Sequence, residues 1–160
     1  MKRNKTCRIN VFAIILFVIT GLYIGFIWIH STMNAETSTG ESMFVLEMLT
    51  NFMKSIGINA ELTDHIVRKS AHFCEFALLG CLSMLCVYLI NKNIIKDLMP
   101  SGFVCLFVAV IDEYIQTYSP GRTCEVKDVL LDFTGSIFGA TIFIILIIII
   151  LLIKKRKKRK

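Results

Sequence analysis

Ionisable residues recur at helical spacing near the start of an apolar stretch in the middle of the chain. Arg68, Lys69, His72 and Glu75 open a run that then stays mostly apolar to Ile90. At about 100° per residue, these four side chains fall within roughly a 120° arc of one helix. An ionisable group inside a membrane segment is costly, so it is a functional candidate. His72 is the natural proton-transfer residue of the set, because imidazole titrates near neutral pH.

Two later segments continue the pattern with polar residues four positions apart. Gln116 follows Asp112 at that spacing, and Asp132 follows Asp128, so each pair shares one helix face. The catalytic candidates, which would transfer a proton, orient the imidazole or bind a cation, are His72, Glu75, Asp112, Glu113, Asp128 and Asp132. The candidates for binding a phosphate or carboxylate of the substrate, which suits arginine forks, are Arg68, Lys69, Gln116 and Arg122.

The elements that carry these residues are predicted to cross a membrane. Of the 160 residues 55% are hydrophobic, and the mean hydropathy is +0.67, which is too apolar for a soluble domain of this size. Runs long enough to span a bilayer as helices lie at 9–30, 66–90, 100–118 and 128–153. We expect an all-α fold with four transmembrane helices in a single domain over residues 1–160.

Local patterns predict further detail of the helices. Pro100 is expected to open the third helix, because proline is tolerated in a first turn, which leaves 91–99 as a loop. Residues 44–56 place apolar side chains on one face and polar ones on the other. This pattern indicates a helix in the membrane interface or a surface helix packed on the bundle. Gly135 and Gly139 are expected to let a neighbouring helix approach closely.

The distribution of basic residues predicts the orientation. Of the 18 lysines and arginines, 13 lie before the first helix, between the second and third helices, or in the basic tail 154–160. Because such residues accumulate on the cytoplasmic side, both termini are expected in the cytoplasm and the ionisable cluster at the outer leaflet. The basic tail is interpreted as a membrane-flanking segment beside anionic lipid, not as a site for nucleic acid.

Several kinds of chemistry lack support in the sequence. The six cysteines lie mostly in apolar segments and form no CxxC pair, which disfavours a disulfide framework and a zinc or thiol redox site. No P-loop, HExxH motif or nucleophilic serine elbow occurs. A magnesium-type site from three carboxylates is the weaker interpretation, because arginine and lysine would compete for the same oxygens. We therefore predict no metal site and no cofactor.

The ordered motifs resemble the VanZ-like family of bacterial membrane proteins. They are Arg68-Lys69-x-x-His72-x-x-Glu75-Phe76-x-x-Leu79-Gly80, Asp112-Glu113-x-x-Gln116, Pro120-Gly121-Arg122 and Asp128-Val129-x-x-Asp132-x-x-Gly135-x-x-x-Gly139. The resemblance covers about 66–140, and this chain has Ile115 where some members place a histidine. It implies a multi-pass protein of the bacterial plasma membrane, a cell-envelope context and an association with teicoplanin resistance, but no particular reaction.

These observations favour a membrane protein that binds or modifies an amphiphilic envelope molecule at the outer leaflet. The expected partners are membrane lipids or a lipid-linked envelope precursor. Three alternatives stay open: a binder without catalysis, a polar cluster that only fixes helix packing, and a proton-coupled carrier. The carrier is disfavoured because the acids gather at one end of the helices. The residues leave open whether a reaction is catalysed and how many chains assemble.

Overall fold

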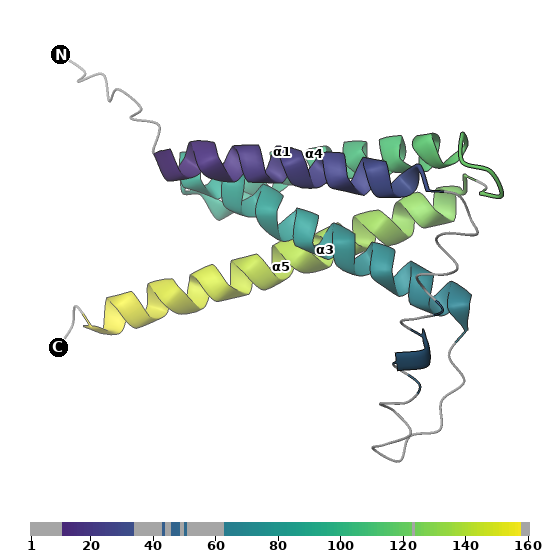
Figure 1. Cartoon of the computed structure of the whole chain (residues 1–160). Coiled ribbons are helices and arrows are strands. Elements are labelled where there is room, and N and C mark those ends of the chain that lie inside the picture. Colours follow the sequence, from purple (N-terminus) through teal and green to yellow (C-terminus); the bar gives the residue numbers. More distant parts are fainter. Residues whose placement is uncertain are drawn as a thin grey trace.

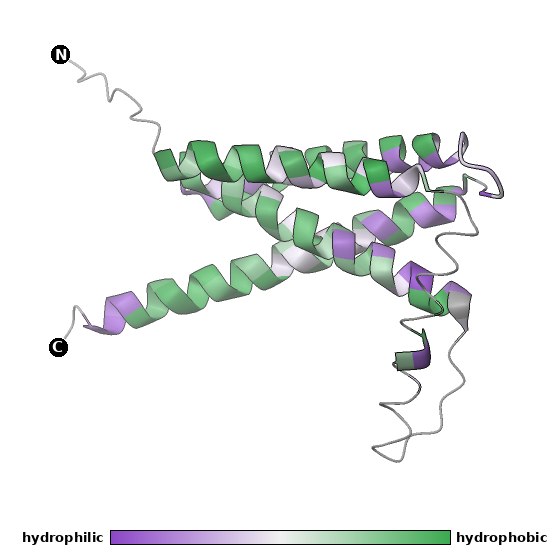
Figure 2. Cartoon of the chain, viewed as in Figure 1, coloured by the Kyte–Doolittle hydropathy of each residue, from purple (hydrophilic) through white to green (hydrophobic). Residues whose placement is uncertain are grey.

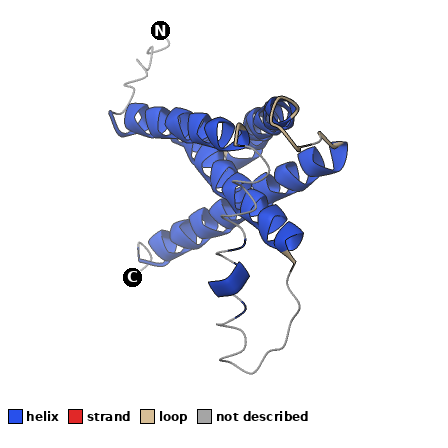
Figure 3. Ribbon diagram, turned by 45° about the vertical axis from the view of Figure 1, so that its right-hand side comes forward, coloured by secondary structure: helices blue, strands red, loops and turns tan. Residues whose placement is uncertain are grey.

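Four long helices form a bundle in the computed structural model of the chain (Figures 1 and 3). It describes residues 11–33, 63–122 and 124–157, with the isolated positions 43, 46–48 and 50, and no strand occurs among them. The helices are α1 (Val11–Ser31), α3 (Asp64–Asn91), α4 (Ile94–Gln116) and α5 (Val126–Lys157). Each is long and apolar enough to cross a membrane. The expectation of an all-α membrane bundle is confirmed.

Apolar residues make up most of the four helices, as the hydropathy colours of Figure 2 show. Leu22, Phe103 and Ile148, for example, are all exposed. A helix that is apolar around its whole circumference is typical of a membrane span, because hydrocarbon solvates such side chains as well as a protein core does. Polar residues gather instead at the first turns of α3 and α5 and at the basic end of α5.

The helices alternate in direction, which gathers their polar termini at one end of the bundle. There α1 and α4 end while α3 and α5 begin, and we call this the site end. The start of α1 and the end of α5 both lie at the opposite end, apart from one another (Figure 1). The described helices thus give four candidate membrane spans, an even number. That the site end faces outward remains a prediction from the basic residues.

The helices α3 and α5 cross with their backbones in contact (Figures 1 and 3). Gly135 lies against the carbonyl group of Phe73, and Gly139 lies against the backbone of Ala77. On the other helix, Gly80 lies against the backbone of α5, so a methyl group at any of these three glycines would overlap main-chain atoms. The close approach expected at Gly135 and Gly139 is therefore confirmed.

The core lies where α1, α3 and α4 meet. Within the described helices, α1 contacts α3 and α4 and does not contact α5. The side chains of Ser83 and Ser101 hydrogen-bond at 3.1 Å between α3 and α4, a polar link typical of membrane helices. The fully buried cluster consists of Ile27, Phe76, Leu79, Cys105, Val108 and Ala109.

The third helix begins at Ile94 and not at Pro100, so the sequence-based start was wrong. The Asn93 side chain caps the new first turn by accepting a backbone N–H at 3.2 Å. The buried Asp97 carboxylate accepts from Asn91 Nδ2 at 2.8 Å and from the Asn93 N–H at 3.2 Å. These bonds satisfy donors at the helix start and shorten the expected 91–99 loop to two residues. Pro100 consequently lies inside α4, where it removes one backbone hydrogen bond.

The predicted interfacial helix at 44–56 lies almost wholly outside the described residues. Only positions 46–48 and 50 of that segment are described, and they are helical. The expectation of a helix in the membrane interface therefore stays a prediction.

Candidate functional site

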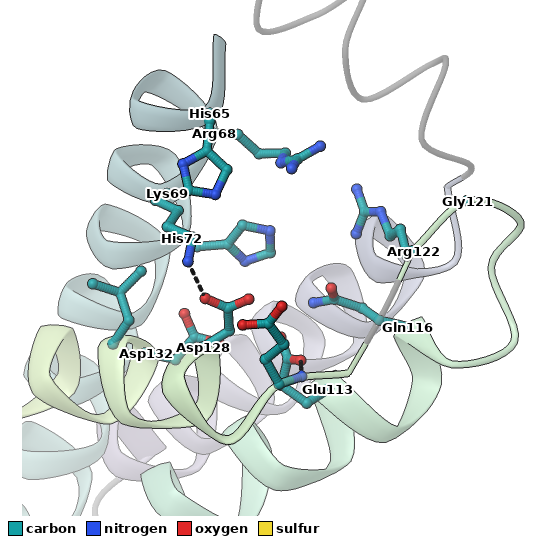
Figure 4. Close-up of a pocket in the computed structure, with 12 residues that line it drawn as sticks. His65, Arg68, Lys69, His72, Glu113, Gln116, Gly121, Arg122, Asp128 and Asp132 are labelled. Atoms are coloured by element: carbon teal, nitrogen blue, oxygen red, sulfur yellow. Dashed lines mark hydrogen bonds and ion pairs between the residues drawn. The ribbon is translucent and has the colours of Figure 1, made fainter. Parts of the chain in front are cut away.

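A polar cavity of about 150 Å³ opens at the site end between α3, the end of α4, the α4–α5 loop and the start of α5 (Figure 4). Eight of the ten residues proposed from the sequence line it, namely Arg68, Lys69, His72, Glu113, Gln116, Arg122, Asp128 and Asp132. The remaining lining residues are His65, Gly121, Glu125 and Leu131. Cations and carboxylates from three helices and one loop thus face one small volume.

Two guanidinium groups face one another on one side of this cavity (Figure 4). Arg68 from α3 and Arg122 from the loop point toward one another (Figure 4). Burial lowers the pKa of Arg122, and the positive charge of Arg68 lowers it further, although an arginine side chain stays protonated in proteins. The Nη2 atom of Arg122 is buried and has no hydrogen-bond partner among the described residues. Two facing guanidinium groups with an unused donor are suited to an oxyanion.

The third cation of the cavity is paired with a carboxylate. Lys69 Nζ donates to Asp128 Oδ1 at 2.5 Å, and about a quarter to a third of each side chain is exposed. Glu113 Oε2 accepts the backbone N–H of Glu125 at 3.2 Å, which fastens the loop to the end of α4. Lys69 therefore holds α3 against α5, while the two arginines keep donors for another partner.

Two of the sequence-proposed residues, Asp112 and Glu75, lie behind the cavity and do not line it. Asp112 is fully buried; its Oδ1 accepts from Ser31 Oγ at 2.5 Å and its Oδ2 from Gln116 Nε2 at 2.9 Å. Glu75 Oε1 lies 3.2 Å from His30 Nδ1, whereas Glu75 Oε2 is buried and has no hydrogen-bond partner. Both acids therefore contact α1, which the sequence analysis had treated as apolar only.

Helix α1 contributes site residues that sequence reasoning missed. His30 stands with its ring centroid 6.4 Å from that of His72, and Tyr23 Oη donates to the backbone oxygen of Glu75 at 3.0 Å. The sequence contained an indication of this contribution, because His30 and Ser31 end the first apolar run. In a bundle of alternating helices, the end of the first helix lies at the same end as His72 near the start of the second. His65 and Glu125 were also missed, although both stand within a turn of named site residues on α3 and α5.

Three of the proposed residues converge from three different helices. His72 of α3, Asp112 of α4 and Asp132 of α5 place potential ligand atoms within 4.8 Å of one another. Asp132 is 1% exposed, and its Oδ2 atom has no hydrogen-bond partner. His72 Nδ1 is also buried without a partner. The spacing within α3, α4 and α5 could not show this meeting, because it depends on how the helices cross.

An apolar groove of about 350 Å³ adjoins the polar cavity on the outside of α3 and α5. It shares His65, Lys69 and Leu131 with the cavity. The other residues that line the groove are Ile66, Ser70, Phe73 and Cys74. The polar cavity and the apolar groove thus meet at one edge of the bundle.

Comparison with known families gives a match along most of the chain. The family model described as VanZ/LLP1 matches residues 12–150. The chain belongs to the VanZ/LLP1 family. The VanZ/LLP1 match extends beyond the 66–140 region that carries the sequence motifs, and it includes α1 with its contribution to the site. No curated protein and no solved structure matches the chain.

Proposed function

We propose that this VanZ/LLP1 protein binds the anionic head group of an amphiphilic cell-envelope molecule at the outer leaflet of the bacterial plasma membrane. The observation that carries the proposal is the pair of facing guanidinium groups, Arg68 and Arg122, in a cavity that adjoins an apolar groove. A phosphate or carboxylate between them would relieve their mutual repulsion. It would also supply an acceptor for the buried Nη2 atom of Arg122.

The size of the cavity limits the part of the ligand that it can enclose. Its volume of about 150 Å³ is below the roughly 300–1,000 Å³ of pockets that enclose a drug-sized ligand. A single phosphate or carboxylate group therefore suits the cavity better than a whole sugar or peptide. Larger parts of a lipid-linked precursor would remain outside, on the aqueous side of Arg68 and Arg122.

The adjoining groove favours an amphiphilic ligand over a free anion. Ile66, Phe73 and Leu131 present apolar surface next to the polar cavity. A hydrocarbon chain in this groove would place its own head group beside Lys69, which lines both spaces. The small side chain of Cys74 keeps the groove open, and Cys74 is exposed.

A second candidate function is chemical modification of the bound molecule. It is favoured by His72, whose Nδ1 atom is buried without a partner while the side chain lines the cavity. An imidazole in that position could transfer a proton to or from a bound head group. A purely structural role of the cluster is less consistent with the same residues, because helix-fixing polar groups are expected to satisfy one another.

Lipid binding by purified protein tests the proposal. Native mass spectrometry should show tighter binding of phosphatidic acid than of phosphatidylcholine, and Arg122→Gln should lower the affinity for phosphatidic acid about tenfold or more, since a hydrogen bond to a charged group contributes about 1.5–3 kcal/mol. Lys127→Gln is the matched control, because Lys127 is exposed at the start of α5 and does not line the cavity. Equal losses in both variants, or equal binding of the two lipids, would contradict a built head-group site.

Two additional variants separate the parts of the proposal. Cys74→Trp should fill the groove and weaken lipid binding while leaving the affinity for inorganic phosphate unchanged. His72→Gln should abolish turnover but spare lipid binding if the protein modifies its ligand, because a proton-transfer group acts mainly in the transition state. The proposal extends to glycopeptides through the family resemblance: cells producing the protein should show reduced susceptibility to teicoplanin, and Arg122→Gln should reverse it.

A further inference from the structure

The convergence of His72, Asp112 and Asp132 has the composition of a metal site. One imidazole and two carboxylates offer atoms within 4.8 Å of one another, and they come from α3, α4 and α5. The two aspartates are 0% and 1% exposed. Burial of two carboxylates at this separation is costly without a neutralising partner, because each charge loses its hydration and repels the other.

Among the described residues, no lysine or arginine forms an ion pair with Asp112 or Asp132. Lys69 is bound to Asp128, and among the described residues Asp112 accepts hydrogen bonds only from the neutral donors Ser31 and Gln116. Asp132 Oδ2 is nearly inaccessible to solvent and has no hydrogen-bond partner in the part of the chain that the structure describes. The sequence analysis argued against a metal site because lysine and arginine would compete for the carboxylate oxygens. That competition does not occur at Asp112 and Asp132.

The overall charge of the site also favours a bound cation. Three permanent cations, Arg68, Lys69 and Arg122, face a larger group of acids. The carboxylates at or directly behind the cavity are Glu75, Asp112, Glu113, Glu125, Asp128 and Asp132. An additional divalent cation would reduce this excess of negative charge, whereas an anionic head group alone would increase it.

The partners of Asp112 resemble the outer shell of a metal centre. Ligating carboxylates are commonly oriented by hydrogen bonds from neighbouring groups. Ser31 and Gln116 hold one oxygen of Asp112 each, at 2.5 Å and 2.9 Å. Ser119 Oγ in turn donates to the backbone oxygen of Ser31 at 3.0 Å, which fixes the end of α1. These contacts orient the carboxylate and leave each of its oxygens a second lone pair.

We propose that His72, Asp112 and Asp132 bind one divalent transition-metal ion, Zn²⁺ or Mn²⁺. The imidazole favours Zn²⁺ over Mg²⁺ and Ca²⁺, whereas the two carboxylates suit Mn²⁺ and also bind Zn²⁺. Three protein ligands leave coordination positions for water or a ligand oxygen. The ion site rests on its own geometry. Only the idea that an open position receives a phosphate oxygen from the cavity depends on the proposed function.

Metal titration of the purified full-length protein tests the site. After treatment with a chelator, the protein should bind one Mn²⁺ per chain, measured as loss of the electron paramagnetic resonance signal of aqueous Mn²⁺, and Zn²⁺ should displace it. Asp132→Asn and His72→Gln should each lower the affinity by at least about tenfold, and Ser31→Ala by about 10–100-fold as an outer-shell change. Asp132→Glu, which keeps a carboxylate, should retain more affinity than Asp132→Asn.

Glu47→Gln is the matched control, because Glu47 is exposed and does not line the cavity. It should change the affinity by no more than about twofold, because it removes one negative charge without altering a proposed ligand or a hydrogen-bond partner of a ligand. Equal losses in Glu47→Gln and Asp132→Asn would overturn the site in favour of general attraction by acids, as would absence of saturable binding up to millimolar ion. Each variant is compared by elution volume and melting temperature, so that misfolding is recognised. Phosphatidic acid binding without metal binding would overturn this inference alone, and metal binding without lipid binding would overturn the proposed function alone.

Discussion

Gly139→Ala should force apart the two helices on which the site depends. A methyl group at Gly139 would stand 2.5 Å from the carbonyl carbon of Ala77 and 2.9 Å from its Cα, and closer still to the oxygen. Ordinary contact begins at 3.4 Å, so the carbonyl carbon has to withdraw by at least about 0.9 Å and the carbonyl oxygen by more. Because the obstructing atoms are backbone and not the end of a flexible side chain, α3 and α5 must separate.

The size of the effect follows from two opposing contributions. Inserting a methyl group into a well-packed interior costs about 1–3 kcal/mol. Alanine is a better helix former than glycine by at most about 1 kcal/mol, which offsets part of this cost. Because the obstructing atoms are backbone, we take the upper end of the cost, about 3 kcal/mol, and expect a net loss of about 2 kcal/mol in the free energy of unfolding. About 1.4 kcal/mol corresponds to a factor of ten in the equilibrium constant.

Equilibrium unfolding in mixed micelles, with increasing amounts of a denaturing detergent, measures this loss. Gly25→Ala in α1 and Gly102→Ala in α4 are controls, since a methyl group at either position has nothing within 4 Å. Both should leave stability unchanged or slightly raised. The separation should also weaken head-group binding, because Asp132 lies two turns from Gly139 on the same helix. The same stability for Gly139→Ala and Gly25→Ala would refute the close crossing.

Two further predictions concern other parts of the chain. With Cys124 as the sole cysteine, a membrane-impermeant maleimide should label intact cells from outside, and a cysteine at position 158 should be protected; external labelling at 158 would reverse the orientation. Burial and nearby carboxylates raise the pKa of Cys124, so its thiolate is scarcer at neutral pH than that of an ordinary cysteine, and labelling should accelerate as pH rises. Asp97→Ala should destabilise the bundle by about 1–3 kcal/mol, because it leaves the donors of Asn91 and Asn93 unpaired. An unchanged unfolding midpoint would show that water replaces the buried carboxylate.

The sequence by itself determined the all-α architecture with four candidate membrane spans and most of the residues that line the cavity. Hydropathy and length indicate four spans because a bilayer requires about 20 consecutive apolar residues for each helix. Helical periodicity also placed Asp128 and Asp132 on one face, with Gly135 and Gly139 continuing the stripe. Both inferences are local, since they depend only on the rise and twist of a single helix. The prediction that α4 starts at Pro100 was wrong for a local reason as well. Asn93 and Asp97 resemble loop residues in the sequence, and only their hydrogen bonds show that they cap the helix.

Only the tertiary structure decided which helix faces meet. Periodicity fixes the direction of a side chain around its own axis, but not the rotation or crossing angle of one helix against another. The glycine contacts between α3 and α5 set that crossing and bring His72 near Asp132. Packing of α1 against α3 and α4 places His30 beside Glu75 and Ser31 on Asp112. These contacts join residues more than 40 positions apart, so they follow from side-chain packing across the whole bundle and not from any single stretch of the chain.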